Sequence, residues 1–297
     1  MELEYFVVDV FTERVLEGNP LAVVMNPGWL TTGQMQAIAR EFNLSETSFI
    51  ERRAAAVELA EGVRVRIFTT QEELNFAGHP TLGTASVLKQ HTPDTVEGDT
   101  VTLALNVGAV PVRFSGPELH GEMIQRDAVF GEELEAAEVA RLIGLTLNDL
   151  DLELPPQVVS TGTAFAIVVL RSAEALARLR VSQQEATQWL RARGARWFYI
   201  LGPAETQISG EMPAWRARMQ FHGGEDPATG SAAGCAISYL VGRGAVASGV
   251  QIHVRQGVEI GRPSDLFLSA RRESSRVTDV RVAGSTVFVA NGHLFLP

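Results

Sequence analysis

A histidine and an aspartate stand at matching places in two similar segments of the chain. Residues 79–85 (HPTLGTA) and 226–232 (DPATGSA) align without a gap, 147 residues apart in a chain of 297. A repeat at about half the chain length predicts two copies of one structural unit. If both segments border one pocket, the imidazole of His79 and the carboxylate of Asp226 meet there. Such a pair suits proton transfer.

Each of the two segments has the composition of a helix start. Proline fits the first turn of a helix, where its missing N–H is not needed. The small residues at Gly83 and at Gly230-Ser231 leave backbone N–H groups accessible, and a helix N-terminus carries a partial positive charge. These ends could therefore bind a carboxylate or phosphate. Small residues also allow a helix to pack closely inside a barrel of strands, and the two explanations carry about equal weight.

A third candidate for chemistry is Glu46, which lies in the segment NLSETSF at 43–49, between Phe42 and Phe49. If its side chain points inward, desolvation would raise its pKa and make it a usable acid/base near neutral pH. Most glutamates are exposed to solvent, and an edge strand would give the same pattern. The residues alone favour the exposed alternative.

Other chemistries have weaker support in the sequence. The six histidines show no metal-ligand spacing, and neither Gly-x-Gly-x-x-Gly nor a Walker A motif occurs. Ser231 lacks the Gly-x-Ser-x-Gly turn of hydrolases. Lys89 is the only lysine and lies near the end of a predicted helix, which disfavours Schiff-base chemistry. Cys235 is the only cysteine, so an internal disulfide is excluded, and its apolar surroundings indicate packing.

Composition narrows the partners and the compartment. The net charge of −10 argues against nucleic acid or an anionic membrane as partner, because binding either requires a basic face. We find neither a signal peptide nor an apolar stretch of the ~20 residues that span a bilayer. A single cysteine fits a reducing compartment. We therefore expect a cytoplasmic protein, while the net charge says little about a small substrate, which responds to local charge.

The expected elements place these residues in an α+β fold, since many strands and a few helices occur in each half. In the first half we expect strands at 3–11, 21–25, 45–51 and 100–114, a helix from Thr31 or Thr32 to about residue 42, a hairpin at 57–69, and a helix from 79 to about 90. In the second half we expect helices at 132–143, 174–180, 183–193 and 226–241, and strands at 157–159, 164–170, 197–201, 251–255, 266–270 and 277–295. The halves are expected at residues 1–118 with 285–297 and at 119–284. Their crossing falls near 117–121 and 132–133, and the active site lies in the cleft between the halves.

Taken together, these segments resemble the PhzF-like family, which is named for an isomerase of phenazine biosynthesis. The resemblance rests on motifs spread over essentially the whole chain: VDVFT at 8–12, GNPLAVV at 18–24, LSET at 44–47, AGHPTLG at 77–83, EDPATGSA at 225–232, and QG at 256–257 with GRPS at 261–264. Each motif alone is weak. Their joint occurrence in this order is highly specific.

The resemblance implies two lobes of the diaminopimelate-epimerase-like fold, each a strand barrel around a central helix, in a homodimer without a cofactor. Family members of known chemistry move a proton on a small carboxylated substrate. By resemblance, Glu46 is the principal acid/base, and His79 and Asp226 assist it or orient the substrate. The implied substrate-binding residues are Ser45, Gly78, Gly83, Gly230 and Ser231. Related epimerases use two cysteines, which this chain does not have, in agreement with a carboxylate taking that role.

The family context reverses the preference for an exposed Glu46, because a closed cleft would bury it. We therefore expect a cofactor-independent isomerase or epimerase. The alternative is a small-ligand-binding protein with the same two-lobed cleft and no catalysis, since fold does not settle function. A hydrolase that uses Ser231 has little support, and the sequence does not identify the substrate.

Overall fold

The chain divides into two compact units. The computed structural model describes residues 2–25, 28–93, 96–116, 119–204, 212–221 and 224–296. Unit 1 comprises Met1–Ile124 and Ala283–Pro297, and unit 2 comprises Gln125–Val282. Both units mix helices and strands, so the predicted α+β class is confirmed. Part of the expected crossing, residues 117–118, lies outside the described residues, as does His222.

Unit 1 is a closed barrel of eight strands around one helix. The strand pairing runs β1–β2–β3–β4–β7–β8–β9–β19 and returns to β1, with β2–β3 and β4–β7 parallel. The strands are β1 (Glu2–Val10), β2 (Asn19–Val24), β3 (Glu46–Glu51), β4 (Val63–Phe68), β7 (Thr100–Leu105), β8 (Gly108–Ser115), β9 (His120–Ile124) and the unit 1 part of β19 (Arg276–Phe295). Short strands β5 (Glu73–Leu74) and β6 (Val96–Glu97) pair with β4 and β7. The sequence places a boundary after residue 118, whereas β9 pairs with β8 and so belongs to unit 1.

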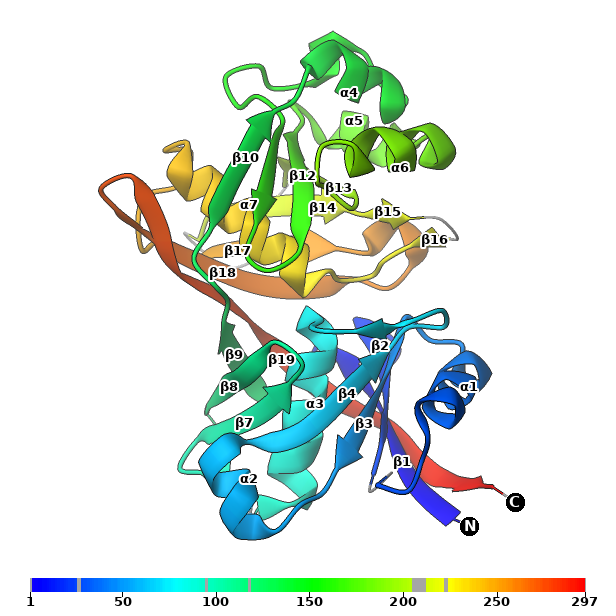
Figure 1. Ribbon diagram of the computed structural model, residues 1–297. Coiled ribbons are helices and arrows are strands. Elements are labelled where there is room, and N and C mark those ends of the chain that lie inside the picture. The colour runs from blue at the N-terminus through cyan, green and yellow to red at the C-terminus, as the bar shows by residue number, and fades with distance from the viewer. Residues whose placement is uncertain are drawn as a thin grey trace. The chain divides into compact units, whose positions relative to one another are not determined.

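Helix α3 (Gly78–His91) fills the barrel of unit 1, as Figure 1 shows in cyan. Its residues from Gly78 to Leu88 are all buried. A Cβ atom at Gly83 would lie 2.7 Å from the side chains of both Leu21 and Val10. The small residues of this helix therefore allow it to approach the barrel wall closely.

Helix α1 (Thr32–Phe42) covers the outside of the barrel. As predicted, Thr31 caps it, with the Thr31 hydroxyl accepting a hydrogen bond from the Gln34 backbone N–H. Its buried residues Met35, Ile38 and Ala39 pack in one apolar cluster with residues of the barrel strands. The 3.6-residue spacing of these side chains is what made the helix recognisable in the sequence.

Three predicted elements differ from the structure, and one of them is the helix at 226–241, which begins only at Gly230. Residues 57–69 do not form a hairpin: α2 (Ala55–Glu61) precedes β4, because the run of alanine, leucine and glutamate favours a helix. Buried Glu58 anchors this helix by accepting hydrogen bonds from the Arg53 backbone N–H and from Arg52 Nε. The predicted helix at 132–143 begins later, as α4 (Ala136–Leu142). Residues Val129–Glu133 form β10 because they pair with β11.

Unit 2 contains a sheet in the order β10–β11–β12–β13–β14–β17–β18, with β12–β13 and β14–β17 parallel. Its strands are β11 (Gln157–Ser160), β12 (Ala164–Val169), β13 (Phe198–Pro203), β14 (Ala214–Arg218), β17 (Ile252–Gln256) and β18 (Ser264–Glu273), followed by the start of β19. The remaining short elements are β15 (Gln220–Phe221), β16 (Gly224–Glu225) and the 3₁₀ turns η2 (Leu147–Asp149) and η3 (Val258–Ile260).

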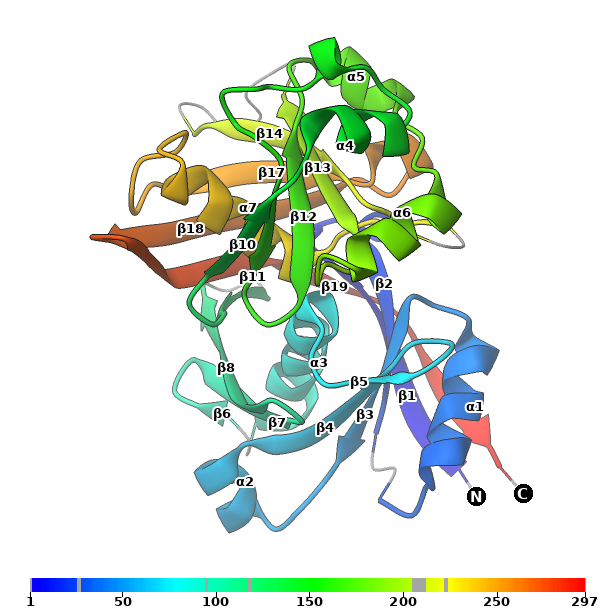
Figure 2. The same ribbon diagram turned by 45° about the horizontal axis from the view of Figure 1, so that its top comes forward.

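Helices pack against the strands of unit 2 in two layers. The buried helix α7 (Gly230–Gly242) packs against β11, β12, β13 and β18. Helices α4, α5 (Ala173–Arg178) and α6 (Gln183–Arg191) lie close together in Figure 2. Their buried side chains form a separate apolar cluster with Ala166 and Val168 of β12. Because side chains alternate along a strand, β12 is buried on both faces. Among the described residues, no helix is long and apolar enough to cross a membrane.

Candidate active site

His79 is held inside unit 1 as a neutral imidazole. It is the second residue of α3, and only 4% of it is exposed. At His79 Nδ1 the ring has two neighbours, the Asn19 amide Nδ2 at 3.2 Å and the backbone carbonyl of Pro20, and the tautomer decides with which of them Nδ1 forms its hydrogen bond. Burial lowers the pKa of His79 to about 3, since the charged ring would lose its hydration. His79 is therefore uncharged at neutral pH.

Glu46 faces the other nitrogen of this ring. Its Oε2 lies 3.6 Å from His79 Nε2, and its side chain is 17% exposed. Within the described part of the chain, Nε2 has no hydrogen-bond partner. Glu46 begins β3, which runs parallel to β2 in the register Leu21↔Glu46. Adjacent strands thus carry the carboxylate and the residues that fix the ring, and α3 brings the ring between them.

The position of Asn19 depends on a tight turn before β2. Gly18 has φ +70°, and a Cβ there would lie 2.5 Å from the carbonyl oxygen of Val10. Asp9, itself buried, fixes the same loop through Oδ2, which accepts the Leu16 backbone N–H at 2.7 Å. The sequence analysis gave Asn19 no role of its own. The signal that could have identified it is its place in the GNPLAVV motif.

The other predicted residues of unit 1 lie on the same two elements. Ser45 directly precedes Glu46 and is half-buried. Gly78 is the first residue of α3 and is buried, so its backbone N–H belongs to the start of the helix. Gly83 lies farther along α3, against Leu21 and Val10 of the barrel wall.

In unit 2 the predicted residues surround the start of α7. Gly230 is its first residue and Ser231, half-buried, is its second. Asp226 precedes the helix and is 8% exposed. Asp226 Oδ2 accepts a hydrogen bond of 2.6 Å from the Thr229 hydroxyl. The turn before α7 therefore holds this carboxylate against Thr229, whose role sequence reasoning missed.

The structural repeat has a different register from the sequence repeat. Arg66 forms a two-bond ion pair with Glu73, and Arg218 forms one with Glu225. Each glutamate lies just ahead of a central helix. The pairs 66 and 218, 73 and 225, and the helix starts 78 and 230 are all 152 residues apart. The equivalence of His79 and Asp226 is thus wrong: by position in the helix, His79 corresponds to Ser231.

We call the ion pairs Arg66–Glu73 and Arg218–Glu225 the two Arg–Glu clamps. Their bidentate geometry shifts the pKa values of their members. The ion pair with Arg66 lowers the pKa of Glu73, and that with Glu225 raises the pKa of Arg218 against the opposing effect of its burial. Charge-assisted bidentate bonds are the strong ones in proteins. In both units such a clamp fixes the chain shortly before the central helix begins.

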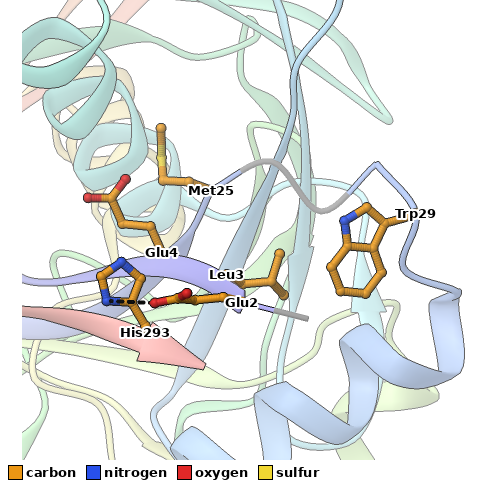
Figure 3. A pocket seen from close by; sticks show the side chains of 6 residues that line it. All are labelled: Glu2, Leu3, Glu4, Met25, Trp29 and His293. Atoms are coloured by element: carbon orange, nitrogen blue, oxygen red, sulfur yellow. Dashed lines mark ion pairs between the residues drawn. The ribbon is translucent and has the colours of Figure 1, made fainter. Parts of the chain in front are cut away.

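A shallow pocket of about 430 Å³ lies elsewhere in unit 1 (Figure 3). It is lined by Glu2, Leu3, Glu4, Met25, Trp29 and His293, where His293 Nδ1 lies 3.6 Å from Glu2 Oε1. It contains none of the predicted site residues. Among the residues with described placement, no group of three His, Cys, Asp or Glu side chains could hold a metal ion.

The comparisons with known proteins agree with this fold. A family model described as phenazine biosynthesis-like protein, PhzC-PhzF, matches residues 8–292. The chain belongs to this family. It is 33% identical, over 98% of its length and 99% of the relative's, to trans-2,3-dihydro-3-hydroxyanthranilate isomerase of Pseudomonas chlororaphis. This family membership makes the protein an isomerase, as the resemblance predicted.

Solved structures of other proteins share this fold. A predicted epimerase from Pseudomonas aeruginosa is 33% identical, with a TM-score of 0.83 over 99% of this chain and 100% of that one. A PhzF-family phenazine biosynthesis protein from Bacillus anthracis superposes with a TM-score of 0.87 over 100% of both chains. At 24% identity, that second likeness concerns the fold alone.

Proposed function

We propose that this isomerase moves a proton on a small carboxylated substrate without a cofactor, with Glu46 as its acid/base. The observation that carries the proposal is the pair of Glu46 and His79, 3.6 Å apart, in which the imidazole is buried and neutral. General acid/base catalysis needs a carboxylate that can both take up and return a proton. An imidazolium would hold Glu46 in its ionised form. A neutral ring does not.

In this proposal Glu46 removes a proton from a carbon next to a carboxyl or unsaturated group and returns it at that carbon or another. His79 Nε2, which faces Glu46, polarises the substrate or passes the proton on. A proton abstracted in this way leaves negative charge on the substrate. Preorganised N–H groups stabilise such charge without having to reorient.

The helix starts supply these N–H groups. Gly78 begins α3, and Gly230 and Ser231 begin α7. We propose that Ser45, Gly78, Gly230 and Ser231 bind the substrate, with Asp226 orienting it. Gly83 contacts the barrel wall, so we assign its small size to packing.

The substrate class is suggested by relatives rather than by this site. Relatives at 32–34% identity bear the name trans-2,3-dihydro-3-hydroxyanthranilate isomerase, a reaction on a carboxylated ring. That compound is the first to test. We propose a homodimer on the family resemblance alone, to be checked by light scattering of the purified protein.

Solvent-deuterium incorporation tests the proposed function. The protein is incubated in heavy water with dihydrohydroxyanthranilate and a panel of small carboxylic and amino acids, and products are read by mass spectrometry. We expect label in one compound with wild type and with Glu41→Gln, an exposed control on α1 that makes the same chemical change. We expect none with Glu46→Gln. Equal labelling by Glu46→Gln would remove Glu46 from the mechanism.

The same experiment separates an isomerase from a binding protein. A compound that binds wild type tightly and is recovered unlabelled and unchanged would favour the non-catalytic alternative. Binding of that compound to Glu46→Gln, measured by calorimetry, shows whether the variant retains its site.

A further inference from the structure

The QG motif at 256–257 has so far had no role. Gln256 is the last residue of β17 and is fully buried. Its Nε2 donates to the Asp226 backbone oxygen at 2.8 Å and to Thr229 Oγ1 at 3.0 Å. Its Oε1 accepts from the Thr229 backbone N–H at 3.1 Å and from the Tyr199 hydroxyl at 3.0 Å. Both donors and both acceptor sites of the amide are therefore used.

The direction of each of these hydrogen bonds is fixed by chemistry. A backbone N–H only donates, so the oxygen of the Gln256 amide must face Thr229 N. Nε2 then faces the Thr229 hydroxyl and donates to it. Because Thr229 Oγ1 accepts a hydrogen bond from Gln256 Nε2, its own hydrogen points away from Nε2. This hydrogen is donated to Asp226 Oδ2, at an O···O distance of 2.6 Å.

Tyr199 provides the second hydrogen bond to the amide oxygen of Gln256. Its ring is fully buried, and burial raises its pKa, so the hydroxyl keeps its proton and donates to Gln256 Oε1. The charge of Asp226 acts in the same direction on Tyr199. The orientation of the Gln256 amide is thus set by two donors, from Tyr199 and from the backbone of Thr229.

The backbone next to Gln256 lies directly against the turn that carries Asp226. Gly257 has φ +78°, and a Cβ there would lie 2.7 Å from the Pro227 carbonyl oxygen and 2.3 Å from that of Arg262. A residue with a side chain cannot occupy this position without moving the turn. The end of β17 therefore leaves the segment from Asp226 to Thr229 little freedom.

We propose that Gln256 is a positioning residue for Asp226, acting through the Thr229 hydroxyl. The amide orients that hydroxyl, and the hydroxyl holds Oδ2 as a hydrogen-bond acceptor. The carboxylate is thereby fixed in rotation about its Cβ–Cγ bond. The catalytic consequence rests on the proposed function. The hydrogen-bond relay itself does not.

A spectroscopic experiment tests the relay without a substrate. Protein carrying aspartate labelled with ¹³C at Cγ is compared between variants, and the Asp226 signal is assigned by its loss in Asp226→Asn. We expect this signal to move in Gln256→Met, which removes the amide, and equally in Thr229→Val, which removes the hydroxyl. We expect a smaller shift in Tyr199→Phe, which removes one of the two donors to Gln256 Oε1 but keeps the other, the Thr229 backbone N–H. An unmoved signal in Gln256→Met would overturn the proposal.

Kinetics test the consequence for catalysis. We expect Gln256→Met and Thr229→Val each to lower kcat about 10-fold with KM changed less than about 2-fold, because an interaction of the reacting state is lost. The double variant should be no slower than the slower single variant, since both changes break one relay. Multiplicative losses would contradict the proposal.

Two safeguards keep the experiment decisive. If Gln256→Met does not fold, Gln256→Asn withdraws the amide by one methylene while retaining its polarity, and the same shift of the Asp226 signal is expected. If wild type exchanges no proton with any compound, the proposed function fails. The Asp226 signal still decides whether Gln256 positions the carboxylate.

Discussion

The starts of α3 and α7 occupy the same place in their units and are equipped differently. At the second position of α3 stands His79, buried, neutral and 3.6 Å from Glu46. At the second position of α7 stands Ser231, half-buried, while Asp226 in the preceding turn is bound to Thr229 and, through it, to Gln256. Both helices begin with small residues, and an Arg–Glu ion pair lies shortly before each of them in the chain.

The comparison shows how one scaffold provides two kinds of site. In unit 1 a titratable carboxylate faces an imidazole nitrogen that lacks a hydrogen-bond partner among the described residues, an arrangement able to exchange a proton. In unit 2 the hydrogen bonds that link Gln256, Thr229 and Asp226 each have one possible donor and one acceptor. This arrangement fixes the orientation of the Asp226 carboxylate. The site of unit 1 thus suits proton exchange, and that of unit 2 suits the fixing of a carboxylate.

The largest expected contrast concerns catalysis. Glu46→Gln should lower the rate of deuterium exchange about 10²- to 10⁴-fold, the usual contribution of a general acid/base. Ser231→Ala should lower kcat less than about 10-fold and act mainly through KM, because it removes a binding group. Steady-state kinetics on the compound that exchanges will measure both. A larger loss of kcat in Ser231→Ala would reverse the division of labour.

The two clamps provide the next contrast. The side chains of Arg218 and Glu225 are 8% and 6% exposed, whereas those of Arg66 and Glu73 are 16% and 23% exposed. Arg218→Leu should destabilise the protein by about 3–5 kcal/mol, because it leaves a buried carboxylate unpaired. Arg66→Leu should cost about 1 kcal/mol, since solvent reaches Glu73. Urea unfolding followed by circular dichroism will measure both, and equal losses would argue against the difference in burial.

Packing of the central helices gives a smaller effect. Gly83→Ala should cost about 1–3 kcal/mol, because the added methyl group overlaps Leu21 and Val10. At the corresponding position of α7, 152 residues on, Cys235 is accommodated and fully buried. Cys235→Ala should therefore cost about 1 kcal/mol through a small cavity. A stabilising Gly83→Ala would show that the barrel of unit 1 can expand.

A dependence of stability on pH should give an effect of similar size. His79 has a pKa of about 3 in the folded protein and an ordinary value of 6.5 when unfolded. The unfolded chain therefore takes up a proton first as pH falls, and stability is lost between pH 6.5 and 3. By pH 5.5 the loss should reach about 1.4 kcal/mol. Urea unfolding at pH 8 and pH 5.5 should show this extra loss in wild type and not in His79→Gln.

Local sequence patterns were sufficient for much of the fold. The cap at Thr31 and the spacing of Met35, Ile38 and Ala39 predicted α1. The α+β class and the family also followed from the sequence, because ordered motifs and element types are properties of the chain itself. Where local patterns conflicted with strand pairing, as at Val129–Glu133, the prediction was wrong.

What the sequence by itself determined is which residues carry reactive groups and which segments repeat. The tertiary structure decided between registers of that repeat, because the starts of the two central helices and their Arg–Glu ion pairs are 152 residues apart and not 147. It also decided the roles of Asn19 and Gln256. Each acts through a hydrogen bond to a residue far away in the chain, Asn19 on His79 and Gln256 on Thr229, and such a contact has no periodicity or local spacing by which a sequence could reveal it.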